Sequence, residues 1–200
     1  MKHVVEALRK KDAKMARAVE TYFAREDATT GRPSHPFASL ARSIVGQQLS
    51  TKAADSIWRK FSSLFPKKRV TAPHLATLHD ETLRSAGLSR GKIKALRSLS
   101  SHVEQHKTFF HTISKRSTEE IYERLTEVHG IGPWTVEMFL MFTLRREDVF
   151  SPGDLGLRKG IQKLYKLPVL PSPQESSERA KRWAPYRTHA SRALWHLLDT

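Results

Sequence analysis

The sequence predicts an all-α protein. Apolar residues recur at helical spacing in most segments, and glycines and prolines separate these segments at short intervals. No stretch alternates apolar and polar residues over a length typical of a strand. The run LPVLP at 167–171 has a strand-like composition, but proline breaks it near both ends. We therefore expect helices joined by short turns.

The amino-terminal part predicts one helix, a loop and then two helices. Residues 4–23 place apolar side chains at helical spacing with Lys and Arg between them, which is typical of an amphipathic helix with a solvated basic face. Residues 25–36 contain a glycine and two prolines and are expected to form a loop. Residues 37–65 predict two helices that meet at GQQLS, with Ser50 as the N-cap of the second. The expected core residues there are aromatic: Phe37, Trp58, Phe61 and Phe65.

The rest of the chain continues this pattern. Residues 79–106 predict a short helix, a glycine turn and a longer helix. Ser117 and Glu120 have the spacing of a capping box at the start of the next helix. The sequence HGIG ends that helix, and Pro133 suits the first position of the following one because the N–H it lacks would be unpaired there. A final pair of helices is expected within 171–183 and 185–198.

The charge of the chain predicts a polyanionic partner. Thirty-five Lys and Arg stand against twenty Asp and Glu, which gives a net charge of +15 and a pI near 10.3. DNA, RNA and an anionic membrane surface all fit this charge. Because the basic residues are spread through the chain, they favour a folded charged face over a disordered arm.

The composition also excludes several classes of site. The 200 residues contain no cysteine, which excludes disulfides, thiolate zinc sites and cysteine-ligated iron–sulfur clusters. The longest apolar run, MFLMF, is too short to cross a bilayer, and the amino terminus lacks the apolar core of a signal peptide. We expect a soluble intracellular protein that does not act at a membrane.

A glycine hairpin is the first motif with a chemical use. Val128, Gly130, Ile131 and Gly132 lie between two predicted helices in the pattern of a helix-hairpin-helix. Glycines allow the backbone to approach a phosphate, and the free N–H groups at the start of the second helix are donors for an anion. The alternative is an ordinary helix C-cap glycine followed by a tight turn.

Five segments, taken in order along the chain, favour the helix-hairpin-helix over the ordinary turn. They are IVGQQLS at 44–50, AGLSRGKIKALRSL at 86–99, VHGIGPWTVEMF at 128–139, DVFSPGDLGL at 148–157 and RWAPYRTHASRALW at 182–195. With them the chain resembles the helix-hairpin-helix DNA glycosylase superfamily, and within it the alkylated-base branch of the 3-methyladenine DNA glycosylase II type. The resemblance implies one all-α unit over residues 1–200 with two helical lobes, the motif at about 118–144 and the active site in a cleft between the lobes. The amino-terminal sheet domain of longer relatives is not expected here.

The resemblance assigns the catalytic role to Asp154. Breaking an N-glycosidic bond builds positive charge on the sugar, and a fixed carboxylate stabilises that charge or orients the attacking water. The alternative is that Asp154 is simply the N-cap of a helix after Pro152 and Gly153. Both roles are compatible.

The resemblance also implies a base pocket and a subclass. Members that cleave the strand carry a lysine directly after the hairpin, and this chain has Trp134 there, which predicts base release without lyase activity. Trp134 and Trp195 match pocket aromatics, which favour a cationic alkylated purine, whereas Met138 departs from relatives that have an aromatic residue. The alternative for each Trp is a place in the core. Lys159 and Lys163 do not match the lysine position.

Further roles concern the DNA. The resemblance implies a wedge at Gln48, with Gln47 and Leu49 beside it and Ser50 near the minor groove. A polar corner between two helices is the alternative. The expected contacts to the DNA backbone are those of the hairpin and of the helix that follows it: Gly130, Ile131, Gly132 and Thr135.

No cofactor is expected. In similar hairpins backbone carbonyls coordinate potassium or sodium, and the matching carbonyls here belong to Thr126, Val128 and Ile131. His102 and His106 lie four residues apart, but no third ligand completes a metal site, so solvated histidines are the better interpretation.

These expectations lead to one function and two alternatives. The leading hypothesis is a monomeric, monofunctional glycosylase that excises 3-methyladenine, with 7-methylguanine as a second candidate, from duplex DNA in a bacterial cytoplasm or a eukaryotic nucleus. The first alternative is a non-catalytic or weakly active DNA-binding protein that uses the hairpin only for backbone affinity. The second is a glycosylase for a mismatched or oxidised base, against which Trp134 argues.

Overall fold

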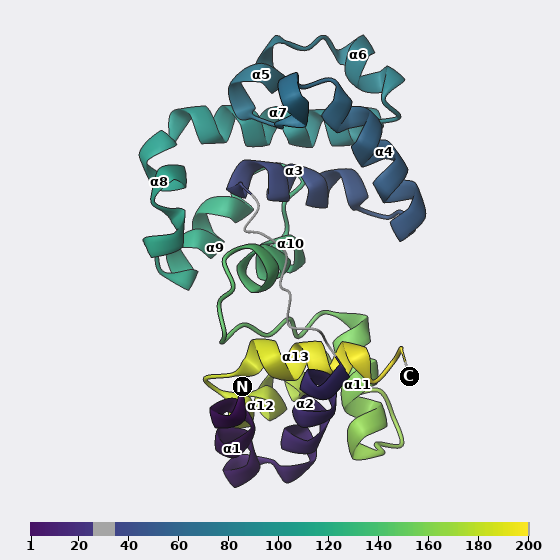
Figure 1. The fold of residues 1–200 in the computed structure, drawn as a ribbon, viewed down its shortest axis with the longest axis vertical. Helices are drawn as coiled ribbons and strands as arrows, with labels where there is room; N and C mark the ends of the chain where they lie inside the picture. Colours follow the sequence, from purple (N-terminus) through teal and green to yellow (C-terminus); the bar gives the residue numbers. More distant parts are fainter. Residues whose placement is uncertain (26–34, 200) are drawn as a thin grey trace. The chain divides into compact units, whose positions relative to one another are not determined.

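The computed structural model describes residues 1–25 and 35–199. Regular structure within these residues is helical and contains no strand, which confirms the predicted fold class (Figure 1). No helix in that part of the chain is both long and apolar enough to span a membrane. The chain forms two compact units. We call residues 1–25 with 140–199 the terminal unit, and residues 35–139 the central unit.

The terminal unit joins the two ends of the sequence around one core. Helix α13 packs on α2 and on α11, and α1 packs on α2. Trp183 is the largest fully buried side chain of the core that these helices share. The helices of this unit are α1 Lys2–Lys11, α2 Ala13–Arg25, α11 Leu155–Tyr165, α12 Pro173–Ala180, the 3₁₀ turn Lys181–Trp183 and α13 Arg187–His196.

The expectation of one helix over residues 4–23 is wrong. The chain breaks at Asp12, whose backbone is extended, and α1 and α2 form on either side of it. The Asp12 Oδ1 accepts the N–H of Met15 at 3.1 Å, and its Oδ2 accepts from Tyr165 Oη and Trp183 Nε1. Aspartate competes for backbone donors in this way and therefore favours a helix start over a helix interior. Amphipathic spacing continues across the break, which is why the sequence pattern does not reveal it.

The central unit is built around the long helix α7. Helix α7 packs on α3 and α5, and α9 packs on α10. Phe37, Phe61 and Phe65 are buried as predicted, whereas Trp58 is only partly buried and lies under the guanidinium of Arg42. The helices are α3 Pro36–Gly46, α4 Thr51–Ser63, the 3₁₀ turn Pro66–Lys68, α5 Ala72–Thr77, α6 Asp80–Ser85, α7 Arg90–Gln105, α8 Lys107–His111, the 3₁₀ turn Ile113–Lys115, α9 Thr118–Thr126 and α10 Pro133–Met138.

The local signals place most boundaries correctly. Ser50 and Ser117 are N-caps of α4 and α9, and Pro133 opens α10 after the hairpin. At Ser117 the hydroxyl accepts the N–H of Glu120, while the carboxylate of Glu120 meets Arg116. The reciprocal capping box forms instead at Ser172, at the start of α12. The loop predicted over 25–36 falls mostly outside the described residues.

The helix after the hairpin does not end with α10. A π-helical turn, Phe139–Thr143, continues it. The boundary between the units in the sequence falls inside this turn. π-Turns inside helices are uncommon and recur near functional sites.

Candidate functional site

Asp154 lies at the amino end of α11 in the terminal unit. It is the N-cap of this helix, and its Oδ1 accepts the backbone N–H of Leu157 at 2.8 Å. The positive end of the helix dipole favours a negative charge at this position. The half-buried side chain is therefore a helix cap, as the simpler interpretation requires, and it is also a carboxylate held in one orientation.

Trp195 fixes the same carboxylate from α13. Its indole Nε1–H donates to Asp154 Oδ1 at 3.0 Å, so this oxygen accepts from two N–H donors. The Trp195 ring also stacks on Phe142, with centroids 5.9 Å apart and planes at 29°, and the guanidinium of Arg192 lies 5.1 Å from the centre of the Phe142 ring. The edge of Trp195 thus orients the acid. Its predicted role as a pocket wall concerns the ring face and stays a prediction.

Two glycines on α11 allow Trp195 to reach Asp154. A Cβ at Gly156 would lie 3.0 Å from Asp154 Oδ1 and from two atoms of the Trp195 indole. One turn later, a Cβ at Gly160 would lie 2.7 Å from the carbonyl oxygen of Leu194, which precedes Trp195. The distance at Gly160 is too short for a Cβ, and the distances at Gly156 are tighter than ordinary Cβ contacts, so the small residues allow close contact between α11 and α13. The spacing of these glycines in DLGLRKG was a signal available in the sequence.

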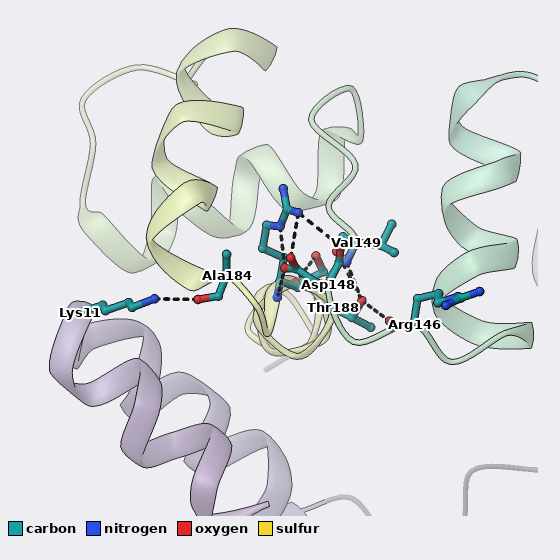
Figure 2. Close-up of polar contacts among 8 residues, drawn as sticks. Lys11, Arg146, Asp148, Val149, Ala184 and Thr188 are labelled. Carbon is teal, nitrogen blue, oxygen red and sulfur yellow. Dashed lines mark hydrogen bonds and ion pairs between the residues drawn. The ribbon is translucent and has the colours of Figure 1, made fainter. Parts of the chain in front are cut away.

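A second set of contacts holds the segment that precedes Asp154. Arg187 Nε and Nη2 donate to Asp148 Oδ1 and Oδ2 at 2.6 and 3.0 Å, a bidentate ion pair. The buried hydroxyl of Thr188 donates to the carbonyl of Arg146 at 2.6 Å and accepts the N–H of Val149 at 3.1 Å (Figure 2). Helix α13 therefore fastens residues 146–149 with its first residues and Asp154 with Trp195 near its last.

The corner between α3 and α4 carries the predicted wedge. Gln48 lies at its tip with a φ of 57°, a left-handed conformation that is uncommon for residues other than glycine. Gln48 and Leu49 are exposed, and Ser50 caps α4 through its hydroxyl. Gln47 differs from these neighbours, because its amide nitrogen donates to the carbonyl of Gly130 in the hairpin at 2.9 Å.

The hairpin presents glycines on the surface of the central unit. Gly130 has a φ of 84°, and a Cβ there would lie 2.6 Å from the Cβ of Ala95 on α7. Gly132 is exposed, and a Cβ built there would meet nothing within 4 Å. The side chains of Ile131 and Thr135 are buried, so a phosphate would meet these residues through their backbone.

A pocket of about 860 Å³ adjoins the corner and the hairpin within the central unit. Several predicted site residues line it, namely Gln47, Gln48, Leu49, Gly130, Trp134 and Met138. Trp134 is 49% exposed, which distinguishes it from a core tryptophan such as Trp183 at 0%. The wedge, hairpin and pocket residues of this unit are thus brought together, whereas Asp154 and Trp195 are brought together in the terminal unit.

The three residues whose carbonyls are predicted cation ligands, Thr126, Val128 and Ile131, lie between the end of α9 and the start of α10. The carbonyl of Val128 accepts the N–H of Ile131 at 3.0 Å and keeps a second lone pair, so its chemistry fits an oxygen ligand of a hard cation. Among the described residues no group of three His, Cys, Asp or Glu side chains could hold a metal ion. The rings of His102 and His106 lie 4.6 Å apart. The expectation of solvated histidines is wrong for His102, which is buried, and burial lowers its pKa.

Phe142, Asp148, Arg187 and Thr188 are among the residues of this candidate site that the sequence did not predict. Asp148 and Arg187 are 39 positions apart and Phe142 and Trp195 are further apart still, so no local spacing connects them. Thr188 was missed for the same reason, since its partners lie about 40 residues earlier. In a chain with so many Arg residues, one Asp and one Arg far apart in the sequence do not indicate that they form an ion pair.

The comparisons with known proteins identify the class. Residues 41–185 match the model of the HhH-GPD superfamily base excision DNA repair protein family. A helical fold, a glycine hairpin and an oriented aspartate are therefore found together in a chain that belongs to this family of DNA repair proteins.

Individual relatives are similar over most of their length. A DNA-3-methyladenine glycosylase of Schizosaccharomyces pombe is 36% identical over 162 residues, which cover 80% of this chain and 71% of that protein. A crystal structure of a DNA-3-methyladenine glycosidase from Bacillus halodurans has a TM-score of 0.86 and 36% identity, covering 98% of this chain and 89% of its own. A structure of an S. pombe 3-methyladenine DNA glycosylase in complex with abasic DNA has a TM-score of 0.83 and 30% identity, covering 99% and 97%.

Proposed function

We propose that the protein is a monofunctional DNA glycosylase that extrudes alkylated purines, chiefly 3-methyladenine, and hydrolyses their N-glycosidic bond. The observation that carries this proposal is the carboxylate of Asp154, which two N–H donors hold through one oxygen at 2.8 and 3.0 Å. A charge that is fixed before the reaction starts stabilises the transition state without reorganisation.

The chemistry needs one carboxylate and one water. As the bond between the sugar and the base breaks, its electrons leave with the base, and positive charge develops on the sugar carbon. Asp154 stabilises this charge and orients the water, whose oxygen forms the new bond to that carbon while its proton is released. The product is a free base and an abasic site. The reaction therefore requires one negative charge beside the sugar, and Asp154 supplies it although the chain as a whole is basic.

The residue that follows the hairpin supports hydrolysis without strand cleavage. Trp134 occupies the position directly after the hairpin where a Schiff-base lysine stands in bifunctional members. Lys163 donates to the carbonyl of Leu197 at the end of α13, and Lys159 is exposed on α11. Neither lysine replaces the missing nucleophile.

The substrate class follows from the relatives and from the pocket. The relatives at 36% identity carry names that specify 3-methyladenine, and 7-methylguanine is a second cationic purine of the same kind. Trp134 supplies an exposed electron-rich ring for such a base. Met138 in place of an aromatic residue leaves a polarisable but less electron-rich wall, so the range of substrates would differ from that of relatives with an aromatic residue there.

The DNA would be held by the hairpin and opened at the corner. Gly130 and Gly132 bring the backbone to a phosphate, Gln48 and Leu49 enter the space left by the base, and Ser50 lies towards the minor groove. The carbonyls of Thr126, Val128 and Ile131 would hold a potassium or sodium ion that attracts the phosphate, and the chemistry itself requires no cofactor. One monomer suffices for one lesion, and the protein would act wherever the cell keeps its DNA, in the cytoplasm of a bacterium or the nucleus of a eukaryote.

Released bases test the function directly. We expect the protein to release 3-methyladenine from methylated duplex DNA, as measured by chromatography of the supernatant, and to leave the strand intact until it is heated in alkali. Borohydride should trap no covalent complex. Duplex binding without any released base would contradict the proposal and favour the non-catalytic alternative, and a trapped complex would contradict the monofunctional assignment.

A further inference from the structure

Three elements of the central unit are fastened to one another in pairs, and α7 provides two of the fastenings. The first joins α7 to the end of α3. Lys92 Nζ donates to the carbonyl of Val45 at 2.7 Å, one residue before α3 ends at Gly46. Burial lowers the pKa of this ammonium. A cation on a carbonyl in the last turn stabilises a helix end, so the start of the corner is fixed relative to α7.

The second fastening joins α7 to the hairpin. The N–H of His129 donates to Ser98 Oγ at 3.0 Å, and Gly130 lies against Ala95, where no side chain fits. Both partners belong to α7 and lie one turn apart. These two contacts therefore fix the position of the hairpin backbone relative to α7.

The third fastening joins the corner directly to the hairpin. Gln47 Nε2 lies 2.9 Å from the carbonyl oxygen of Gly130 and 3.5 Å from Thr135 Oγ1. A carbonyl oxygen can only accept, so the NH₂ group of the amide must face it. Gln47 is also the C-cap of α3, and the next residue is Gln48 with its left-handed backbone. The amide thus holds the chain directly before the tip of the corner.

We propose that Gln47 is a positioning residue that sets the distance between the Gln48 tip and the phosphate-binding hairpin, so that wedge and hairpin move as one body. This inference rests on the proposed function, because it takes Gln48 as the wedge. It replaces the expectation that Gln47 contacts DNA beside the wedge. When the hairpin holds a phosphate, the tip is then already placed beside the base that has to leave the stack, and extrusion needs no further adjustment of the corner.

The test replaces the amide without changing its length or adding charge. Gln47→Met removes both N–H donors. Gln105→Met is the matched control, since Gln105 at the end of α7 is exposed and its amide donates to Ser101 on the surface. The probe is a duplex with a tetrahydrofuran abasic analogue opposite 2-aminopurine, whose fluorescence reports entry of the wedge without any chemistry. We expect Gln47→Met to weaken the fluorescence response about fivefold, the value of one ordinary hydrogen bond, while affinity for undamaged duplex stays within about twofold.

A double-mutant cycle separates positioning from direct contact. If Gln47 acts through Gln48, then Gln48→Ala has a smaller effect in the Gln47→Met background than in the wild type. Additive losses in the two variants, or a loss of duplex affinity that parallels the loss of fluorescence, would overturn the proposal in favour of two independent DNA contacts.

A measurement without DNA completes the test. In the free protein the side-chain NH₂ protons of Gln47 should exchange with solvent more slowly than those of Gln105, which NMR can measure. Equal exchange would overturn the proposal. The probe duplex contains no cleavable base, so these results stand apart from base release. A wild-type protein that inserts its wedge but releases no methylated base would contradict the proposed function and not the role of Gln47.

Discussion

The two units hold their functional side chains in different ways. In the terminal unit, Asp154 accepts two hydrogen bonds, and the segment before it is tied to α13 by Arg187 and Thr188. In the central unit, the tip at Gln48 is exposed and has an unfavourable backbone conformation, and a single amide joins it to the hairpin. A charge that stabilises a transition state must be oriented in advance, whereas a surface that enters DNA has to remain accessible.

Removing the charge of Asp154 should have the largest effect on base release, and it tests the claim that the terminal unit holds a catalytic charge. Asn is as good an N-cap as Asp and can still accept from Leu157, so Asp154→Asn should fold normally. We expect base release to fall about 10²- to 10³-fold, the scale of losing one fixed electrostatic contact, with duplex affinity largely kept. Single-turnover release of methylated bases measures this, and Asp199→Asn on the exposed carboxyl end is the control. Retained turnover would remove Asp154 from the mechanism.

Removing one donor to Asp154 should have the next largest effect. Trp195→Phe keeps an aromatic ring beside Phe142 but loses the N–H that reaches Asp154 Oδ1. We expect the chemical rate to fall about tenfold, since a hydrogen bond to a charged group contributes about 1.5 kcal/mol or more. Trp183→Phe is the matched control, because Trp183 donates to Asp12 in the same unit. If Trp183→Phe slows the chemistry as much, the effect of Trp195→Phe is one of stability alone.

A smaller effect is expected at the segment that precedes the acid. Arg187→Lys cannot keep the bidentate contact to Asp148, and both side chains are about one-third exposed. We therefore expect a loss of about 1 kcal/mol in unfolding free energy, measured by urea denaturation. Arg9→Lys, in the ion pair with Glu20 where both side chains are more than half exposed, should cost nothing measurable. Equal stability of the two variants would show that the Arg187 pair does not hold the segment.

The smallest expected effect is a pH dependence at His189. Burial lowers the pKa of His189 below its ordinary value of 6.5, partly offset by Glu147 and reinforced by Arg192. Below pH 6.5 the unfolded chain therefore binds a proton that the folded chain binds only at lower pH, so stability falls as the pH falls through this range. We expect His189→Gln to lose less unfolding free energy than the wild type between pH 7 and 5, in parallel urea titrations. Parallel curves would contradict a shifted His189.

Much of this structure could be predicted because its signals are local. Ser50, Ser117 and Pro133 mark helix starts through local effects within three residues, and only one residue separates the two hairpin glycines. Asp12 breaks the first helix although the apolar spacing continues, because a carboxylate that caps a helix and accepts from Tyr165 and Trp183 outweighs that spacing. Asp148 and Arg187 could not be paired in advance, since the fold alone brings residues 39 positions apart together.

The roles of the candidate site residues could likewise be predicted only in part. The resemblance to a family predicts roles for Asp154, Trp134 and the corner, and these stay predictions. It did not predict that the indole N–H of Trp195, at the edge of the ring, donates to Asp154. Nor did it distinguish a glutamine that meets DNA from one that meets the hairpin, because both have the same sequence signature. The partner of a side chain depends on how the helices pack, and local sequence patterns do not predict that packing.

The path of the chain through the terminal unit affects how the protein is made. Helices α1 and α2 are synthesised before the central unit, whereas α13, on which α2 packs, is synthesised after it. The central unit is complete by residue 139 and can therefore fold before α13, on which α2 packs, has been synthesised. Asp154 has no indole to orient it until Trp195 has emerged. With the roles proposed above, a nascent chain would complete its proposed DNA-binding hairpin before its proposed catalytic carboxylate is oriented, so it would bind DNA without releasing a base.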